Sequence, residues 1–159
     1  MGIFVRILVP VDGSEGADQA MRVALTLAED QGATVHFVHV IDDARIIMAA
    51  PAATLGGELL AALKSAGEFL LGQASERAHE RGVVASSALQ LTDASYPRIA
   101  DRIVAEARAE NADIIVCGSH GRTGFSAVLL GRVAESLPRL SQVPVLIVPA
   151  HMAPGAALR

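Results

Sequence analysis

Asp113-Ile-Ile-Val-Cys-Gly-Ser-His-Gly121 runs from four consecutive apolar residues directly into a glycine-rich turn. Such a run is typical of a strand that is buried on both faces of a parallel sheet. Gly118, Gly121 and, ten residues later, Gly131 allow positive φ and let an anion approach bare backbone N–H groups. The start of a helix would add unpaired N–H donors and a favourable dipole. The stretch therefore predicts a strand, a phosphate-binding loop and a helix, in that order.

The same alternation of strand and helix continues along the rest of the chain. Apolar, β-branched runs predict strands at 4–11, 33–41, 83–91, 112–118 and 143–149. Helical periodicity predicts one helix capped by Ser14 and stopped by Gly32, one over 58–81, one opened by Ser95 with Pro97 in its first turn, and one over 126–140. Residues 44–57 are weakly patterned and are interpreted as a loop.

Five strands alternating with four helices predict an α/β fold. Right-handed crossovers between the strands produce an open five-stranded parallel sheet with helices on both faces. The flavodoxin-like or Rossmann-like strand order 3-2-1-4-5 is one common outcome, and it places ligands beyond the carboxyl ends of the strands. In that order Asp12, after the first strand, and Gly118, after the fourth, lie on two sides of one crevice.

Length and composition narrow the class of protein. Residues 1–150 are expected to form a single domain, and the unpatterned segment 151–159 a mobile tail. The 13 Lys and Arg against 17 Asp and Glu leave a net charge of −4 without a basic cluster, which argues against nucleic-acid binding. The first residues do not resemble a secretory leader, and no apolar run reaches the ~18 residues of a membrane span. A cytoplasmic protein without membrane contact is therefore expected, and the single cysteine excludes a disulfide framework.

Glycine spacing by itself leaves two interpretations of the 118–131 block open. The block lacks the Gly-x-x-x-x-Gly-Lys-Ser/Thr pattern of a P-loop and the Gly-x-Gly-x-x-Gly pattern of dinucleotide-binding folds. It is either a strand-to-helix loop that uses glycine only for turning, or an anion site.

Longer sequence motifs, unlike glycine spacing alone, resemble those of a known protein family. Gly118-x2-Gly121-x9-Gly131, with Val143-Pro-Val-Leu-Ile-Val148 beyond it, resembles the universal stress protein family, whose nucleotide-binding members carry Gly-x2-Gly-x9-Gly-Ser/Thr. Ile7-Leu-Val-Pro-Val-Asp-Gly-Ser14 and His39-Val-Ile-Asp42 resemble the family's other two signatures. The resemblance covers residues 4 to 149 and implies the same open parallel α/β sheet.

The resemblance implies a site for an adenine nucleotide, ATP, with Mg²⁺ beside its phosphates. The positions that line the adenosine side are Pro10, Val11 and Asp12, with Val40 packed near the adenine. The positions along the ribose and phosphates are Gly118, Gly121, Gly131 and Val133. The same block adds Cys117, Ser119, His120, Arg122 and Arg132 as candidate contacts. Asp12 is also the candidate ligand of the Mg²⁺ ion, because carboxylate oxygens suit that cation.

One position departs from the family pattern, because Arg132 stands where the family has Ser or Thr. Loss of a neutral hydroxyl bond costs about 1 kcal/mol, whereas an arginine fork aimed at phosphate supplies a charge-assisted contact. Two interpretations stay open. Arg132 binds phosphate, or it points to solvent or occludes the triphosphate and leaves room only for a smaller nucleotide.

Several polar residues also have a purely structural interpretation. Asp12 could cap a helix or form a turn, and Asp42-Asp43 is expected to end a strand. His36 and His39 lie on opposite faces of a strand and are expected to be hydrogen-bonded core histidines. His120 lies within the glycine block, yet no nucleophile or carboxylate is fixed near it in sequence, so no catalytic residue is assigned.

The strand at 143–149 bears on assembly. An apolar strand at a free sheet edge is an aggregation hazard, and pairing with its copy in a second chain would remove it. The family's fifth strand commonly pairs across a two-fold axis, so the resemblance implies a homodimer or a higher oligomer.

The leading hypothesis is an ATP-binding universal-stress-protein-like module whose nucleotide occupancy regulates assembly or partner choice in a stress response. A complete phosphate loop without an identifiable nucleophile or base favours a binding module over an enzyme. One alternative is a slow ATP hydrolase, with Asp12 and a metal orienting water. The other is a dimeric adaptor that works without nucleotide.

Overall fold

The computed structural model describes residues 2–42, 46, 53–121 and 130–151 of the chain. Five parallel strands form one sheet in the order β3-β2-β1-β4-β5, which is the predicted order. The strands are β1 (Arg6–Pro10), β2 (Thr34–Ile41), β3 (Ala85–Leu91), β4 (Ile114–Gly118) and β5 (Val145–Val148). Chain order reverses between the neighbouring strands β1 and β4, and ligands of such sheets bind at this point.

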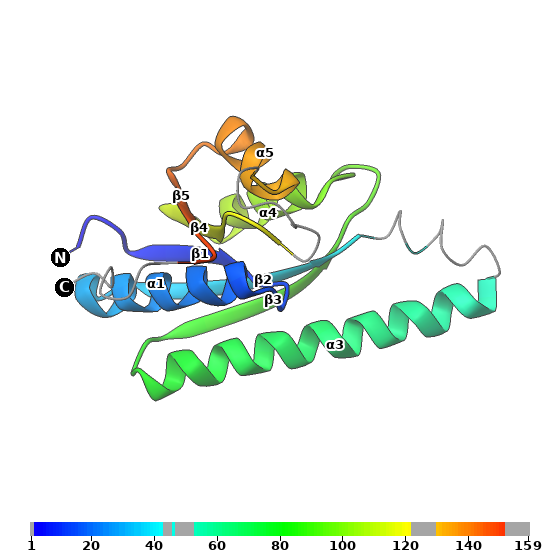
Figure 1. Ribbon diagram of the computed structural model, residues 1–159, viewed down its shortest axis with the longest axis horizontal. Helices are drawn as coiled ribbons and strands as arrows, with labels where there is room; N and C mark the ends of the chain where they lie inside the picture. The colour runs from blue at the N-terminus through cyan, green and yellow to red at the C-terminus, as the bar shows by residue number, and fades with distance from the viewer. Residues whose placement is uncertain (1, 43–45, 47–52, 122–129, 152–159) are drawn as a thin grey trace.

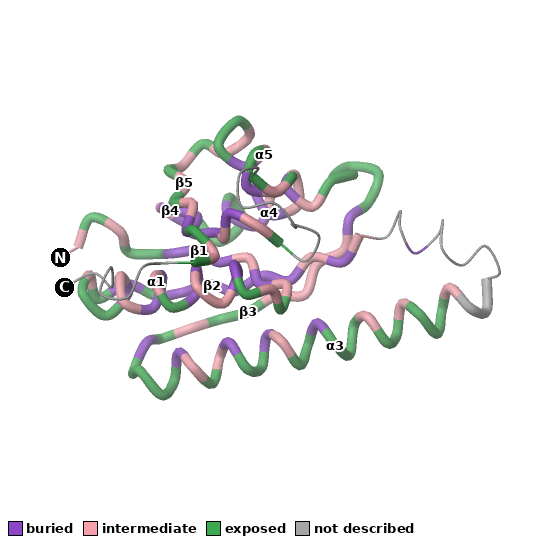
Figure 2. Tube along the Cα trace, in the orientation of Figure 1, coloured by how far each residue is buried: buried purple, intermediate pink, exposed green. Residues whose placement is uncertain are grey.

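Helices cover both faces of the sheet (Figure 1). The helices on one face are α1 (Glu15–Gln31) and α3 (Ala53–Glu80), and those on the other are α4 (Ile99–Ala109) and α5 (Arg132–Leu140). Phe37 lies in the core against α1 and α3, and Leu8 lies in the core against α4 and α5. Because the central strands are buried on both faces (Figure 2), their apolar runs are continuous rather than alternating.

Local capping places the start of α1 beside the carboxyl end of β1. The Ser14 hydroxyl accepts a hydrogen bond from the Ala17 N–H at 3.1 Å, and Gly32 ends the helix with a φ of +66°, both as predicted. Gly13, in the turn between strand and helix, has a φ of +77°, which an L side chain rarely adopts. This turn directs the N-terminus of α1 toward the end of the sheet.

α3 is longer than predicted. It begins at Ala53 rather than at residue 58, so residues 53–57 of the expected loop are helical, and Ile46 is helical as well. The rest of that segment, residues 43–45 and 47–52, lies outside the described residues. The helix includes the Gly56-Gly57 pair, and glycine is unfavourable inside a helix. However, about 1 kcal/mol per glycine is a modest cost for a helix of 28 residues that packs along two strands.

α4 begins later than predicted. Its first residue is Ile99, not Ser95, because the Ser95 N–H donates to the Asp93 carboxylate in a turn that precedes the helix. Arg98 occupies the N-cap position and forms a two-pronged hydrogen bond with Asp101, at 2.8 Å for each prong. The Arg98 side chain therefore accepts no hydrogen bond from the first turn of α4, in contrast with the serine cap that the sequence predicted.

α5 also begins later than predicted, at Arg132 instead of residue 126. Gly131 has an extended conformation, with φ of −64° and ψ of 155°, and serves as the N-cap. Residues 126–129 lie outside the described residues. Within the described part of the chain, no helix combines the length and the apolar character that crossing a membrane requires.

Candidate functional site at the carboxyl ends of the strands

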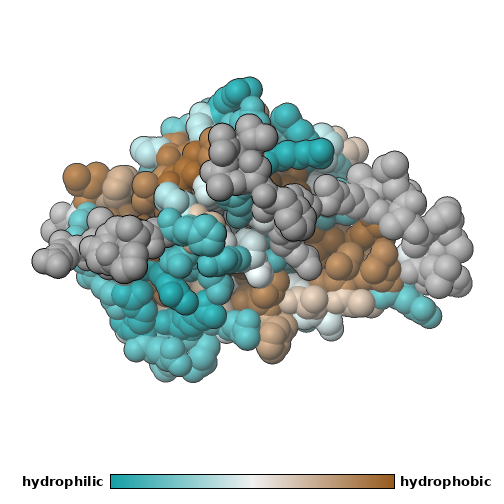
Figure 3. Space-filling model, in the orientation of Figure 1, coloured by the Kyte–Doolittle hydropathy of each residue, from teal (hydrophilic) through white to brown (hydrophobic). Residues whose placement is uncertain are grey.

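A cavity of about 450 Å³ opens beyond the carboxyl ends of β1, β2 and β4. The turn after β1, the loop after β4 and the start of α5 form its polar end, and residues of β2, α3 and α4 form its apolar end. Figure 3 shows apolar surface on this side of the molecule, above the N-terminal half of α3. The cavity thus lies where the strand order reverses, which is the crevice that the sequence predicts.

Asp12 and the glycine loop face each other across the polar end. The Oδ1 atom of Asp12 accepts a hydrogen bond from the Ser14 N–H at 2.9 Å, so the residue does form a turn, while the helix cap itself is Ser14. The Oδ2 atom lies 2.9 Å from the position that a Cβ on Gly121 would occupy. One carboxylate oxygen therefore holds the turn and the other faces the loop.

Close packing, rather than left-handed turning, explains the glycines of the loop. Gly118, Gly121 and Gly131 are not among the described residues with positive φ, so that part of the prediction is wrong. A Cβ on Gly118 would lie 2.5 Å from the carbonyl carbon and oxygen of Gly16, and a Cβ on Gly16 would collide with the His120 carbonyl. The loop therefore lies directly on the first turn of α1. Sequence reasoning missed Gly16, because a glycine in a helix carries no sign of what approaches it.

Backbone hydrogen bonds join the loop to its neighbours. The Ser119 N–H donates to the Val148 carbonyl at 2.8 Å, and the Gly131 N–H donates to the Ser119 carbonyl at 2.8 Å. Ser119 itself is buried and does not line the cavity, and its hydroxyl lies 2.8 Å from Nδ1 of His120. Ser119 thus positions the loop and the histidine, whereas the sequence predicted it as a ligand contact.

His120 lines the cavity with one ring nitrogen unpaired. Its Nε2 atom is buried, and no described residue forms a hydrogen bond with it. Buried polar atoms without partners are rare and call for an explanation. If the Ser119 hydroxyl donates to Nδ1, then Nε2 carries the ring proton and is a free donor. The Ser–His contact is not arranged as a nucleophile with its base, because Ser119 does not reach the cavity.

The start of α5 adds further donors. Gly131 supplies no side-chain hydrogen bond to the helix, and Arg132, Val133 and Ala134 of the first turn line the cavity. The first N–H groups of a helix have no acceptor within it, and the helix dipole favours an anion at this end. Arg132 is exposed and therefore lies at the mouth of the cavity.

The opposite end of the cavity is apolar. Val40 lines this end beside further aliphatic side chains: Val38, Ile41, Ile46, Leu59, Leu63, Ile99 and Ile103. Cys117 also lines the cavity, and burial raises the pKa of its thiol to about 11. The thiol is therefore neutral near pH 7 and packs as a small apolar group.

Most of the predicted site residues come together in this cavity: Pro10, Val11, Asp12, Val40, Cys117, Gly118, His120, Gly121, Gly131, Arg132 and Val133. Ser119 lies behind the wall, and Arg122 lies outside the described residues. The lining residues that the sequence did not assign to the site include Ser14, His39, Asp42, Leu59, Leu63, Ile99 and Ile103. The aliphatic ones follow ordinary helical periodicity, so no sequence signal separates them from core residues.

The two histidines of β2 are hydrogen-bonded and buried, as predicted. His39 Nδ1 lies 2.7 Å from the Val11 carbonyl oxygen, and this contact ties β2 to the cavity end of β1. His36 contacts Ser86 and Glu106 on the other face of the sheet.

Comparisons with known proteins agree with this geometry. The sequence model of the universal stress protein family matches residues 4–149. Universal stress protein MJ0531 of Methanocaldococcus jannaschii is 31% identical over 146 residues, which cover 92% of this chain and 82% of the relative. Universal stress protein YxiE of Bacillus subtilis is 30% identical, with 92% and 99% covered. The solved structure of MJ0577 from M. jannaschii superposes with a TM-score of 0.81 at 26% identity, over 95% of this chain and 99% of that one. Because the family match spans almost all of the chain and the folds agree, this chain belongs to the universal stress protein family.

Proposed function

We propose that this protein binds an adenine nucleotide in the cavity, ATP with Mg²⁺, and that occupancy changes its assembly or its choice of partner in a stress response. The observation that carries the proposal is that a single cavity has an apolar end and an end rich in hydrogen-bond donors. A nucleotide has the same division, with a flat base at one end and phosphates at the other. Pockets that combine apolar walls with a few convergent polar groups are the usual form of small-molecule sites.

The base occupies the apolar end in this proposal. Val40, Ile99 and Leu63 come from a strand and two helices and leave a slot lined by aliphatic carbon. The neutral Cys117 thiol lines the same cavity without adding charge. An aromatic base that leaves water for such a slot gains the hydrophobic contribution of its buried area, about 25 cal/mol per Å².

The phosphates occupy the donor end. His120 Nε2 is a donor when the Ser119 hydroxyl donates to Nδ1, and it has no partner among the described residues. The first N–H groups of α5 are further donors, and Arg132 adds positive charge at the mouth. Asp12 is the one acid of the turn after β1 that faces the loop. Its carboxylate accepts from a ribose hydroxyl or holds Mg²⁺ through oxygen, as that cation prefers.

Two solved structures with this fold lend support by analogy. One universal stress protein is in complex with cAMP, with 21% identity and a TM-score of 0.65 to this chain. Another, from Archaeoglobus fulgidus, is in complex with dAMP, with 24% identity and a TM-score of 0.61. Those ligands belong to those proteins, but both are adenine nucleotides, and this chemistry matches the two ends of the present cavity.

Release of bound nucleotide and calorimetry test the proposal. Denatured, freshly purified protein should release an adenine nucleotide detectable by mass spectrometry, and the stripped protein should bind ATP. Val40→Glu puts a charge into the base slot and should abolish binding. Val84→Glu is the matched control, because Val84 is 71% exposed and lies outside the cavity. Absence of nucleotide, together with no heat from ATP at millimolar concentration, would contradict the proposal and favour the nucleotide-independent adaptor.

Slow ATP hydrolysis is a second candidate, because Asp12 and His120 line the same cavity. A carboxylate that holds a metal can orient water, and an imidazole can stabilise charge on phosphate. Phosphate release by the wild type and by Asp12→Ala separates the two functions. A rate that falls in the variant supports the hydrolase, and equal, negligible rates leave the binding module.

The homodimer is part of the proposal. β5 lies at the edge of the sheet, and Leu146 on it is 39% exposed. β5 is shorter than the predicted 143–149 and lies between Pro144 and Pro149, which limits how far a second strand can pair. Sedimentation should find a dimer, and Leu146→Lys should shift it toward monomer. An unchanged sedimentation coefficient in the variant would show that β5 is not the interface.

A further inference from the structure

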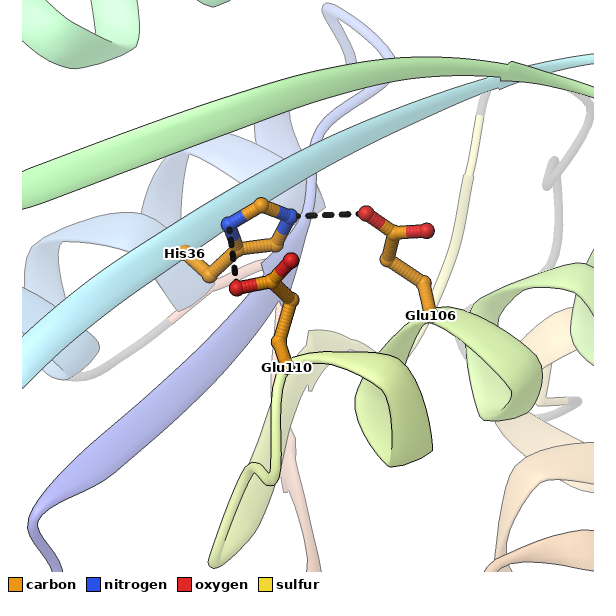
Figure 4. A group of neighbouring side chains, drawn as sticks. All are labelled: His36, Glu106 and Glu110. Atoms are coloured by element: carbon orange, nitrogen blue, oxygen red, sulfur yellow. Dashed lines mark hydrogen bonds and ion pairs between the residues drawn. The ribbon is translucent and has the colours of Figure 1, made fainter.

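A second polar cluster lies near the amino ends of the strands, away from the nucleotide cavity. His36 points from β2 toward α4, and Glu106 and Glu110 point from α4 toward it (Figure 4). One imidazole nitrogen and one carboxylate oxygen from each glutamate all lie within 4.8 Å of one another. The cluster adjoins a separate cavity of about 300 Å³, whose walls include His36, Ser86 and Glu110.

The contacts around the cluster orient its members. His36 Nε2 lies 2.9 Å from Oε1 of Glu106, and His36 Nδ1 lies 2.7 Å from the Ser86 hydroxyl. The other Glu106 oxygen accepts a hydrogen bond from the Gln90 side-chain amide at 2.8 Å. Metal-binding imidazoles and carboxylates are usually held by such outer partners, which set the ring tautomer and the direction of the lone pairs. Here, partners of this kind are already in place for two of the three side chains.

The two carboxylates of the cluster form direct ionic contacts only with His36 among the described residues, and the Arg102 guanidinium is joined to Glu106 through the Gln90 side chain. Glu106 and Glu110 are four residues apart, on one face of the end of α4, where like charges repel and the helix dipole disfavours negative charge. Glu106 is only 7% exposed, and His36 opposes two carboxylates with at most one positive charge. Arg6 lines the adjoining cavity, but it forms no ion pair with the described part of the chain. A divalent ion would bring the two carboxylates and a neutral imidazole to zero net charge.

We propose that His36, Glu106 and Glu110 form a binding site for a divalent transition-metal ion, with Zn²⁺ as the ion that one nitrogen and two oxygen donors suit. The ion takes the position between Nε2 of His36 and Oε1 of Glu106, while Nδ1 keeps its hydrogen bond to Ser86. Zinc bonds to nitrogen and oxygen are about 2.0–2.2 Å long, so ligand atoms lie about 3.3 Å apart in a tetrahedral site.

Glu110 completes the site by a side-chain rotation, because its carboxylate lies beside Nδ1 rather than Nε2 of His36. Its carboxylate is 3.9 Å from His36 Nδ1, and its side chain is 45% exposed, so it can rotate toward the ion without disturbing the core. Three protein ligands leave a fourth position, which water from the adjoining cavity fills. The ion would join α4 to β2, and ligands that bind only the folded state stabilise it by mass action.

Zinc titration of the full chain tests the proposal. Tag-free protein, stripped with EDTA and dialysed, should bind one Zn²⁺ per chain by calorimetry, and its unfolding temperature should rise. His36→Gln and Glu110→Gln should each weaken binding more than about tenfold, and Ser86→Ala, which removes an outer partner, about tenfold. Because Glu110 and Ser86 are partly or largely exposed, their variants should fold, even if the loss of buried Glu106 does not permit folding.

An exposed histidine–glutamate pair provides the matched control. His151 Nδ1 lies 3.6 Å from Glu15 Oε1, and both side chains are exposed. His151→Gln should leave zinc affinity unchanged. Val40→Glu should also leave it unchanged, so that failure of the nucleotide proposal and failure of the zinc proposal are distinguishable. The zinc proposal is overturned by wild-type affinity in His36→Gln and Glu110→Gln, by loss of binding in His151→Gln, or by no binding at millimolar zinc.

Discussion

His36 and His120 lie toward opposite ends of the same sheet and differ in how their ring nitrogens are satisfied. His36, in the first half of β2, has Ser86 at one ring nitrogen and Glu106 at the other. His120, just beyond β4, has Ser119 at Nδ1 and no described partner at Nε2. An unpaired buried polar atom costs about 1–3 kcal/mol of folding free energy. Both ring nitrogens of His36 are therefore hydrogen-bonded within the chain, whereas His120 has one buried nitrogen without a partner among the described residues.

The largest expected effect is on the free energy of unfolding, and it tests how closely the glycine loop packs at the carboxyl ends of the strands. Gly118→Ala would place a Cβ 2.5 Å from the Gly16 backbone, so the loop or the start of α1 must shift. We expect a loss of about 1–3 kcal/mol in the free energy of unfolding, measured with urea, and loss of nucleotide binding. Gly72→Ala is the control, because nothing lies within 4 Å of its Cβ position on α3, and it should stabilise the protein by about 0.5–1 kcal/mol. Equal effects of the two changes would refute the close packing.

Alanine at the two histidines tests the comparison directly. His36→Ala leaves Glu106 with one fewer partner in a buried setting and should lower the free energy of unfolding by about 2 kcal/mol. His120→Ala removes the unpaired Nε2 atom together with the neutral contact between Nδ1 and Ser119, so it should cost about 1 kcal/mol, less than the loss of a contact to a buried carboxylate. That variant should instead lose about tenfold in nucleotide affinity, because a donor to a charged oxygen is removed. If urea unfolding shows that His120→Ala lowers the free energy of unfolding more than His36→Ala does, the comparison of the two histidines is wrong.

Raising the pH should have a smaller effect on stability, through a thiol at the carboxyl end of β4. Burial raises the pKa of the Cys117 thiol from 9.0 to about 11, so between these values the unfolded chain releases the proton first. Because the unfolded state then binds fewer protons, stability falls as pH rises, by about 1 kcal/mol at pH 10. Urea unfolding at pH 8 and pH 10 should show this fall in the wild type and less of it in Cys117→Val. An identical pH dependence in both would mean that the thiol is not the source.

The smallest expected effect belongs to Arg132 at the mouth of the cavity. If its guanidinium binds the outer phosphates, Arg132→Ser should weaken ATP by less than about tenfold and leave AMP nearly unchanged. The loss should be greater at low ionic strength, because exposed charges are screened by salt. Tighter ATP binding by the variant in calorimetry would show that Arg132 occludes the triphosphate.

Predictability from sequence differed between elements for physical reasons. The five strands and the two polar walls of the cavity were predictable, because apolar runs mark buried strands and the glycine block marks the loop after β4. The strand order was only a common outcome of such an alternation, and the pairing of strands far apart in the chain decided it. The starts of α3, α4 and α5 were not predictable. Gly56-Gly57 lies inside α3, and Ser95, the expected first residue of α4, donates its N–H to Asp93 in a turn before the helix. The apolar end of the cavity was hidden because Leu63 and Ile99 have the spacing of ordinary core residues.

The sequence by itself determined the fold class, the alternation of strands with helices, and the turn and glycine loop at the polar end of the cavity, because these depend on local patterns and on a family motif. Only the tertiary structure decided the partners of residues far apart in the chain. Gly16 proved to be packed under Gly118, and His36 proved to lie against Glu106, 70 positions away. Such contacts arise when the sheet and its helices pack together, so no local spacing encodes them.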